Sequence, residues 1–365
     1  MRSPSRFLPC LALTLAACGG GGGGEQIVKP IDTIPQLPTQ SLRQLAETRH
    51  PRVAIGVAVG GLFQSSNARS QQFMTILPRE FNALTPENDL KFGPLRPTRE
   101  TYNYTRADAM VAFARANNMK ARGHVLVWHQ QNPGWLTNGT WTRDQAIQIL
   151  EEHIANVVGH YRGQLAAWDV VNEAFEDGAA PLRQSVWMQR IGRDYIERAF
   201  RAARAADPTV ALYYNDYNIE GLGAKSDSVY ELLRDFKARG VPVDGVGMQA
   251  HFIAGQLPAT MRQNMDRFAA LGLKIQITEL DIRVPTSSVG GASAASLATQ
   301  AQNYRDVFNL CLQVQACDMV VVWGMTDADS WVPGTFPGQG DALLYDAFFN
   351  PKPAYTAVRG LLAGN

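Results

Sequence analysis

The stretch AAWDVVNEAFE at residues 166–176 decides how we interpret the fold of this 365-residue chain. Its first half is short, bulky and mostly apolar, with Trp168 followed closely by two valines, as is typical of a parallel strand buried on both faces. The run then ends in Asn172 and Glu173. A carboxylate at the end of a buried strand is costly unless it is paired or hydrogen-bonded. We therefore expect Glu173 to face a polar site.

A second stretch, far along the chain, has the same pattern. Residues 274–282 read KIQITELDI, an apolar strand in which Glu279 comes directly after the buried residues. If both strands belong to one parallel barrel, their carboxyl ends lie at the same face of the molecule. The pattern thus predicts two carboxylates, Glu173 and Glu279, that face one cleft and are able to act as acid and nucleophile.

Strand-like and helix-like segments alternate along most of the chain. We expect strands at residues 53–59, 83–87, 120–128, 166–173, 211–218, 245–251, 274–279 and 319–325, and helices at 41–48, 105–117, 143–161, 185–206, 225–239, 260–271 and 296–311. Eight strands alternating with helices favour an α/β fold with a single (β/α)8 TIM barrel, which we place at residues 41–363. No GxGxxG follows the first strand, so a dinucleotide-binding fold is not favoured.

The N-terminal residues have the pattern of a signal peptide of the lipoprotein type at 1–17. Arg2 and Arg6 precede a short apolar run, and small residues come directly before Cys18. We expect Cys18 to carry lipid and the Gly/Pro-rich residues 18–40 to form a linker. The alternative is an ordinary cleaved signal. In both cases we expect export, either lipid-anchored in a bacterial cell envelope (periplasmic or at the outer surface) or secreted, with the anchor as the only membrane contact.

Charge and cysteine content narrow the function classes further. The formal net charge is +1, and no basic patch indicates a nucleic-acid partner. Cys10 leaves with the signal and Cys18 would carry lipid, so Cys311 and Cys317 remain as either a disulfide or two buried thiols in an oxidising compartment. No His or second Cys pair lies near them in sequence, which argues against a zinc site. We expect no metal, no cofactor and a monomer.

The predicted strand ends carry most of the polar chemistry, and in a (β/α)8 barrel the active site lies there. The residues at these ends are Glu87, Asn88, Lys91, His124, Trp128, His129, Gln131, Asn172, Glu173, Asn215, Asp216, Tyr217, Asn218, Gln249, His251, Glu279, Asp281, Trp323, Asp327, Asp329 and Trp331. Amides and carboxylates bind neighbouring hydroxyls, and indoles stack on sugar rings. An Arg cluster for phosphate is missing from the set, which suits a neutral polyhydroxylated ligand.

Eight sequence blocks occur in order over most of residues 45–360. They are TPENDLKF (85–92), GHVLVWHQQNPGW (123–135), WDVVNEA (168–174), YNDYN (214–218), GVGMQAH (245–251), ITELDI (277–282), VWGMTDADSW (322–331) and LLYD with NPKPAY (343–355). In these blocks the chain resembles the glycoside hydrolase family 10 endo-β-1,4-xylanases. The resemblance implies endo-hydrolysis of β-1,4-xylosidic linkages in xylan and xylo-oligosaccharides, with retention through a covalent glycosyl-enzyme.

The resemblance also implies a role for each matching residue. Glu173 matches the acid/base, and Glu279 matches the nucleophile. His251 matches the histidine that keeps the nucleophile ionised, and Asn172 matches the amide that holds the sugar 2-hydroxyl. The glycone-side residues are Glu87, Asn88, Lys91, His124, Trp128, Gln131 and Gln249, with Trp323 and Trp331 closing over that side, and Tyr217 lies on the aglycone side.

Other interpretations stay open at this point. A β-1,4-glucanase or an exo-acting glycosidase fits the same barrel, but Trp331 and Gln131 would crowd the C6 hydroxymethyl group of glucose. A non-catalytic glycan-binding lipoprotein would be expected to lack one of the two glutamates. His124 and His129 are also compatible with core positions. For His129 we favour the core, because alternation along the expected strand 120–128 points it away from Trp128.

Overall fold

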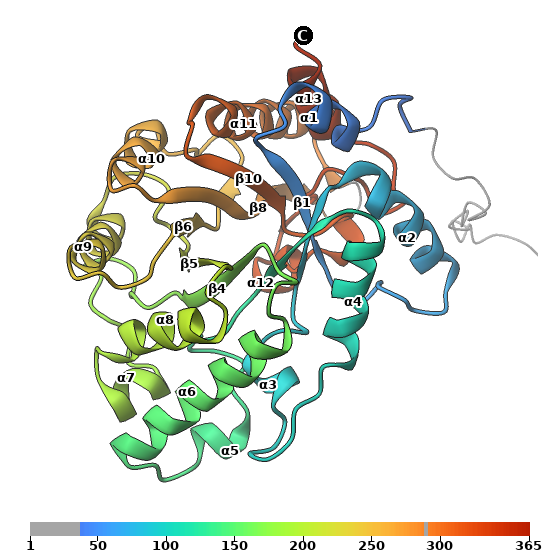
Figure 1. Ribbon diagram of the computed structural model, residues 1–365. Coiled ribbons are helices and arrows are strands. Elements are labelled where there is room, and N and C mark those ends of the chain that lie inside the picture. The colour runs from blue at the N-terminus through green and yellow to red at the C-terminus, as the bar shows by residue number, and fades with distance from the viewer. Residues whose placement is uncertain (1–36, 288–290) are drawn as a thin grey trace, which may run out of the picture. The chain divides into compact units, whose positions relative to one another are not determined.

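Eight parallel strands close into a barrel in the computed structural model, which describes residues 37–287 and 291–365 (Figure 1). The barrel strands are β1 (Ala54–Val59), β2 (Ala83–Pro86), β3 (Lys120–Gly123), β4 (Ala167–Asn172), β5 (Ala211–Asp216), β6 (Gly245–Met248), β8 (Lys274–Ser287) and β10 (Cys317–Val322). The sheet closes because β10 pairs in parallel with both β8 and β1. The predicted single (β/α)8 barrel is confirmed.

Helices surround the barrel, and one long helix follows each strand (Figure 1). These are α2 (Ala68–Glu80), α4 (Thr105–Ala116), α6 (Arg143–His160), α8 (Tyr195–Ala206), α9 (Ala224–Ala238), α10 (Met261–Ala270), α11 (Ala294–Gln313) and α13 (Pro353–Leu362). Before β1 comes α1 (Leu42–Arg49), which begins at a capping box made by Ser41 and Gln44. The predicted signal peptide, Cys18 and nearly all of the predicted linker lie outside the described residues.

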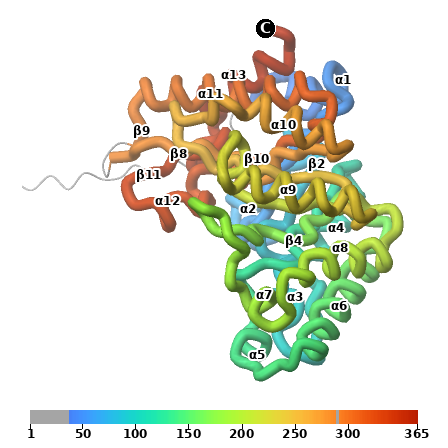
Figure 2. Tube along the Cα trace, turned by 90° about the vertical axis from the view of Figure 1, so that its left-hand side faces the viewer, coloured from blue at the N-terminus to red at the C-terminus, as the bar shows by residue number. Residues whose placement is uncertain are grey.

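Short elements are added mainly where the strands end. The helices are α3 (Phe92–Leu95), α5 (Gly134–Thr137), α7 (Val186–Ile191), the 3-10 turn η1 (Asp327–Asp329) and α12 (Val332–Thr335). The strands β7 (His251–Ile253), β9 (Gly291–Ala292) and β11 (Gln339–Gly340) all pair with the long outer part of β8. Figure 2 shows β9, β11 and α12 together on one side of the barrel. This added sheet supports one wall of the site described below.

Among the predicted elements that differ from the observed ones, two differ for clear physical reasons. The strand expected at 120–128 stops at Gly123, and beyond it Val127 makes an isolated bridge to Val171. The helix expected at 185–206 is two helices, α7 and α8, because Gly192 between them has a φ of +94°. Such a backbone conformation suits glycine and does not continue an α-helix. In addition, two of the long helices around the barrel were not predicted: α2, which contains Pro78 in its last turn, and α13.

A buried ion pair between Arg122 and Asp169 lies inside the barrel, below the strand ends. Arg122 and Asp169 are both fully buried, and the guanidinium contacts both carboxylate oxygens. Arg122 Nε also donates to Gln276 Oε1 at 2.8 Å. Paired charges with satisfied hydrogen bonds are tolerated in an interior. Asp169 in turn lies 2.9 Å from Nδ1 of His124, so the barrel interior fixes the position of one residue at the strand ends.

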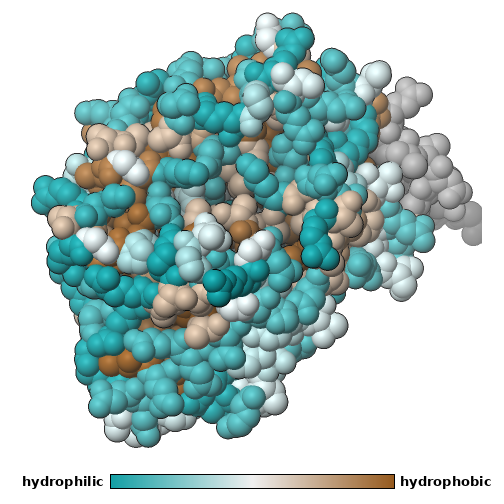
Figure 3. Space-filling view, in the orientation of Figure 1, coloured by the Kyte–Doolittle hydropathy of each residue, from teal (hydrophilic) through white to brown (hydrophobic). Residues whose placement is uncertain are grey.

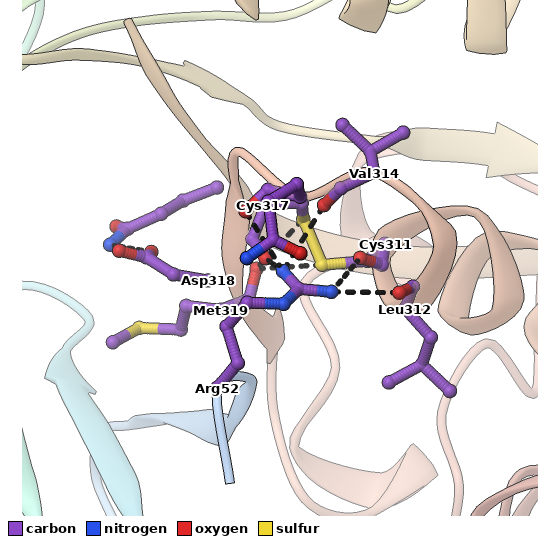
Figure 4. Close-up of a disulfide and its surroundings, with 9 residues drawn as sticks. Arg52, Cys311, Leu312, Val314, Cys317, Asp318 and Met319 are labelled. Atoms are coloured by element: carbon purple, nitrogen blue, oxygen red, sulfur yellow. Dashed lines mark hydrogen bonds between the residues drawn. A yellow bond between two sulfur atoms is a disulfide. The ribbon is translucent and has the colours of Figure 1, made fainter. Parts of the chain in front are cut away.

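A disulfide joins Cys311 and Cys317 at the opposite, amino-terminal end of the barrel (Figure 4). The two Cα atoms are 5.1 Å apart, and the bridge links the end of α11 to the start of β10. Arg52, just before β1, points its guanidinium into this turn, where it donates to Leu312 O at 2.7 Å and to Val314 O at 3.1 Å. The carbonyls at this helix end, which lack intrahelical partners, are thereby satisfied.

We predict that replacing both Cys311 and Cys317 with Ala lowers the free energy of unfolding by about 2 kcal/mol, because the unfolded chain gains the freedom of a short closed loop. The turnover number at 25 °C should stay unchanged, since the bridge lies at the other end of the barrel from the site. Urea unfolding and initial rates measured on the same preparations check both statements. Unchanged stability, or lost activity in a fully folded variant, would contradict this account.

None of the helices in the described part of the chain is long and apolar enough to cross a bilayer. The face in Figure 3 is mostly hydrophilic, with small and scattered apolar areas. Leu222 and Phe348 are the large hydrophobic side chains that remain exposed among the described residues, at 39% and 69%. Isolated apolar side chains of this kind are ordinary on protein surfaces.

Candidate active site

One cavity of about 670 Å³ lies at the carboxyl ends of the barrel strands. Its lining includes every residue for which the sequence predicted a role in substrate binding or catalysis: Glu87, Asn88, Lys91, His124, Trp128, Gln131, Asn172, Glu173, Tyr217, Gln249, His251, Glu279, Trp323 and Trp331. These residues come from seven different strand ends or loops. The barrel therefore brings into one place side chains that are up to 244 positions apart, from Glu87 to Trp331.

Glu173 follows the last residue of β4, and its carboxylate is held by neutral donors. Trp128 Nε1 donates to Oε2 at 2.9 Å. Oε1 accepts from Asn172 Nδ2 at 3.1 Å and from Gln249 Nε2 at 2.9 Å. The residue is 8% exposed, so it lies at the floor of the cavity rather than at its rim. Donors of this kind stabilise the carboxylate when it is ionised and fix where a proton on it would point.

Glu279, on β8, is the second buried carboxylate, and cationic and amide groups surround it. Oε1 accepts from Asn215 Nδ2 at 2.8 Å and lies 3.9 Å from His124 Nδ1. Oε2 lies 3.4 Å from His251 Nε2. Burial alone would raise the pKa of Glu279, but the charges of the two imidazoles and the hydrogen bonds outweigh burial and lower that pKa to about 2. Glu279 is therefore ionised at neutral pH.

His251 lies between two carboxylates. Its Nδ1 is 3.0 Å from Asp281 Oδ2, on the side away from Glu279. Burial would lower the pKa of His251, but Asp281 and Glu279 together raise it to about 10. Trp331 Nε1 donates to the same Asp281 oxygen at 2.7 Å. An imidazolium in this position stabilises the negative charge on Glu279, while Asp281 fixes both the imidazole and the indole.

Amide side chains connect the two carboxylates. Asn215 Nδ2 donates to Glu279 and also to Asn172 Oδ1 at 2.9 Å, and its own Oδ1 accepts from Thr278 Oγ1 at 2.6 Å. Gln249 Nε2 lies 3.1 Å from the same Asn172 oxygen. The sequence placed Asn215 at a strand end but assigned it no role. Only the barrel geometry shows that this amide bridges the two halves of the site.

The predicted glycone side is a polar wall with one cation. Lys91 Nζ donates to Asn88 Oδ1 at 2.9 Å, and Gln131 Nε2 donates to the same oxygen at 3.2 Å. The ammonium also lies 4.8 Å from the centre of the Trp128 ring. Burial removes water from both charged groups, so it raises the pKa of Glu87 and lowers the pKa of Lys91. The attraction between the Glu87 carboxylate and the Lys91 ammonium opposes both shifts. This wall offers fixed donors and acceptors to ring hydroxyls.

Indoles form the opposite boundary of the same side. The Trp323 and His124 rings pack edge to face, with 5.2 Å between the ring centres. The Trp331 and His251 rings pack in the same way, with 4.9 Å between the ring centres. Phe336, which was not predicted, packs against Trp331 at 5.6 Å and also lines the cavity. These edge contacts hold the indoles in place beside the space where a sugar would lie.

His129 is a correction to the sequence interpretation. It lines the cavity, and its Nδ1 is 3.6 Å from Glu173 Oε2, although we expected a core position. The expectation used strand alternation, which does not apply because the strand ends at Gly123. Burial, helped by the charge of Arg183, lowers the pKa of His129 to about 4, so its imidazole is neutral.

The predicted aglycone side contains charged residues that sequence reasoning missed. Tyr217 donates its hydroxyl proton to Asp177 Oδ2 at 3.0 Å and accepts from Arg183 Nη2 at 3.2 Å. Lys225 Nζ lies 3.3 Å from the centre of the Tyr217 ring. Asp177 and Arg183 come from the loop after β4, whose path no local pattern specifies. Within residues 37–287 and 291–365, no group of three His, Cys, Asp or Glu side chains is arranged to hold a metal ion.

Comparisons with known proteins agree with this geometry. The family model described as Glycosyl hydrolase family 10 matches residues 41–361. An endo-1,4-beta-xylanase B from Thermotoga neapolitana is 42% identical over 356 residues, covering 97% of each chain. An endo-1,4-beta-xylanase D from Talaromyces funiculosus is 45% identical over 298 residues, covering 81% of this chain and 71% of the relative.

The fold comparison points the same way. The crystal structure of xylanase 10B from Thermotoga petrophila RKU-1 in complex with xylobiose superimposes with a TM-score of 0.85. Its sequence identity is 44%, and the alignment covers 90% of this chain and 98% of that one. The similarity therefore extends over the whole barrel, including all the strand ends that carry the site.

Proposed function

Since the chain belongs to glycosyl hydrolase family 10, we propose that it is a retaining endo-β-1,4-xylanase whose nucleophile is Glu279 and whose acid/base is Glu173. One observation carries the assignment of roles. Of two buried glutamates in one cavity, Glu279 has cationic neighbours that keep it ionised, while Glu173 has only neutral donors on its carboxyl oxygens. A pair of carboxyl groups with different environments is what double displacement requires.

In the first half-reaction, Glu279 attacks the anomeric carbon while Glu173 gives a proton to the leaving oxygen. The imidazolium of His251 and the amide of Asn215 hold Glu279 in place for the attack. Their attraction to Glu279 weakens as its charge passes into the ester bond. Asn172, between the two carboxylates, is placed to hold the sugar 2-hydroxyl, a contact that strengthens in an oxocarbenium-like transition state.

In the second half-reaction, Glu173 takes a proton from water, which attacks the ester and restores Glu279. The indole N–H of Trp128 and the amides of Asn172 and Gln249 stabilise Glu173 as a carboxylate at this stage. The same residue thus acts as acid and then as base. Two inversions at the anomeric carbon give net retention.

Xylan rather than a glucan is the proposed polymer. Gln131 donates a hydrogen bond to Asn88, and Trp331 donates one to Asp281. These bonds oppose the movement that would make room for a C6 hydroxymethyl group. We expect protein without residues 1–24 to release short xylo-oligosaccharides from xylan and little reducing sugar from carboxymethyl-cellulose. Reducing-end assays on both polymers measure this preference. Higher activity on the cellulose derivative would overturn the proposed substrate, though not the two glutamates.

The pH profile should depend on His251. In the variant His251→Gln, Glu279 loses a positive neighbour, so its pKa rises from about 2 toward the ordinary carboxyl range. Because protonated Glu279 is inactive, the acidic limb of the kcat/KM profile should move to higher pH by about one unit. The exposed His160, on α6, gives a matched control in His160→Gln. An acidic limb at the same pH in both variants would contradict the assigned electrostatics.

We also propose that the enzyme is an exported monomer attached to a bacterial cell envelope through lipid on Cys18. The support is the sequence alone: a basic start, a short apolar run and small residues before Cys18. Metabolic labelling with a radioactive fatty acid, compared with the variant Cys18→Ala, tests the anchor. Label in the variant, or none in the parent protein, would reject it. Sedimentation of the soluble form tests the monomer.

A further inference from the structure

We propose that a closed chain of side chains, called here the peptide clamp, positions the general acid by holding the peptide bond that follows it. The members of the clamp are Tyr214, Asp216, Lys225, Tyr217 and Arg183. The proposal rests on the function proposed above, because it concerns how Glu173 delivers its proton. It adds positioning residues that touch neither the carboxyl group of Glu173 nor the reacting carbon.

The clamp acts on a peptide unit in an unusual place. Glu173 has a φ of +54°, in the left-handed region that residues other than glycine rarely occupy. Such a conformation costs energy and persists only where the surroundings impose it. The carbonyl of Glu173 and the N–H of Ala174 belong to the same planar peptide unit. Whatever holds these two groups therefore sets the direction in which the Glu173 side chain leaves the backbone.

The first arm of the clamp holds the N–H end. Ala174 donates to the Tyr214 hydroxyl at 3.0 Å, and that hydroxyl donates to Asp216 Oδ2 at 2.6 Å. Tyr214 and Asp216 are both fully buried. A buried carboxylate needs a counter-charge, and Lys225 supplies it with Nζ at 3.0 Å and only 5% of its surface exposed.

The second arm holds the carbonyl end. Arg183 Nε donates to the Glu173 carbonyl at 3.1 Å, and Nη2 of the same guanidinium donates to the Tyr217 hydroxyl. The Lys225 ammonium lies over the face of the Tyr217 ring. The backbone N–H of Tyr217 donates to Asp216 Oδ1 at 2.9 Å. Both arms thus contact Lys225 and Asp216. The five residues form a closed chain of contacts that holds both sides of the peptide bond between Glu173 and Ala174.

This arrangement explains why a lysine and an aspartate are buried behind the cavity. If one member is lost, the peptide unit is free to rotate and the Glu173 carboxyl group moves with it. Proton transfer depends steeply on such displacements. Tyr217 also lines the cavity on the leaving-group side. A sugar bound there rests on the ring that the clamp holds, so binding of the leaving group and placement of the acid are mechanically linked.

The test compares two neighbouring tyrosines. Tyr214→Phe removes one hydroxyl from the clamp. Tyr213→Phe removes a hydroxyl that is equally buried on the same strand but has no hydrogen-bond partner among the described residues. Phenyl β-xylobioside needs a proton on its leaving group, and 2,4-dinitrophenyl β-xylobioside does not. For Tyr214→Phe we expect the rate of glycosyl-enzyme formation to fall by about tenfold or more on the phenyl substrate and to stay within about twofold on the dinitrophenyl substrate.

Tyr213→Phe should match the parent protein on both substrates. Equal losses of Tyr214→Phe on both substrates, or no difference between the two variants, would overturn the clamp. If Tyr214→Phe does not fold, Arg183→Lys carries the same test at the other arm, because it keeps the charge but loses the forked geometry. A parent protein that cleaves neither xylobioside would overturn the proposed function itself, which is a different result.

Discussion

The variant Glu279→Ala is expected to lose xylan hydrolysis almost completely, with kcat lower by on the order of 10⁵-fold. The carboxylate that forms the ester is gone, and the groups that contact it, Asn215, His124 and His251, supply no carboxylate in its place. Its amide and imidazole neighbours remain, so substrate should still bind. Initial rates of reducing-end release, with binding of xylotriose measured separately by calorimetry, distinguish lost chemistry from lost affinity.

External azide gives this prediction its sharpest form. In Glu279→Ala, azide can enter the space of the missing carboxylate and attack an activated aryl β-xylobioside, which gives an α-xylobiosyl azide by a single inversion. The exposed Glu231, on α9, supplies the control variant Glu231→Ala, which should keep the parent rate. A β-azide from Glu279→Ala, or substantial residual activity without azide, would show that another residue is the nucleophile.

The barrel could be predicted from the sequence because several strands are short, mostly apolar runs that lead directly into a polar group. The strands around Val170 and Ile277 show this pattern locally, and local patterns are what a sequence displays. The break after Gly123 could not be predicted. It depends on contacts with a distant strand, where Leu126 donates to Asp169 O and Val127 to Val170 O. Strand alternation therefore placed His129 wrongly, although His124 was placed among the correct neighbours.

The site shows the same division between local and long-range information. Glu173 and Glu279 were identifiable because a charged residue at the end of a buried strand is conspicuous in any sequence. The family resemblance implied that His251 keeps Glu279 ionised. No local pattern shows that the pKa of Glu279 is lowered, since this depends on His124 and His251 from two other strands. The peptide clamp is more hidden still. It needs Arg183 from a loop and Lys225 from a helix to meet one peptide bond, and neither residue belongs to a local pattern.

The variant Glu173→Ala is expected to separate substrates by their leaving groups. On xylan and phenyl β-xylobioside, kcat/KM should fall by about 10³-fold, because general acid catalysis of the leaving oxygen is lost. On 2,4-dinitrophenyl β-xylobioside, Glu279 still attacks at nearly the parent rate, since this leaving group needs no proton. The glycosyl-enzyme then accumulates, because no base activates water. A burst of dinitrophenolate followed by a slow steady state is the expected time course.

Azide again identifies the face of attack. In Glu173→Ala, azide needs no general base, so it should restore the steady state and give a β-xylobiosyl azide, the anomer opposite to that from Glu279→Ala. The two variants together thus assign the two carboxylates to opposite faces of the sugar. Trp128 and Gln249 lose their shared acceptor in this variant, and the alanine leaves room for the anion between their N–H groups. An α-azide, or equal losses on phenyl and dinitrophenyl substrates, would require the roles of Glu173 and Glu279 to be reassigned.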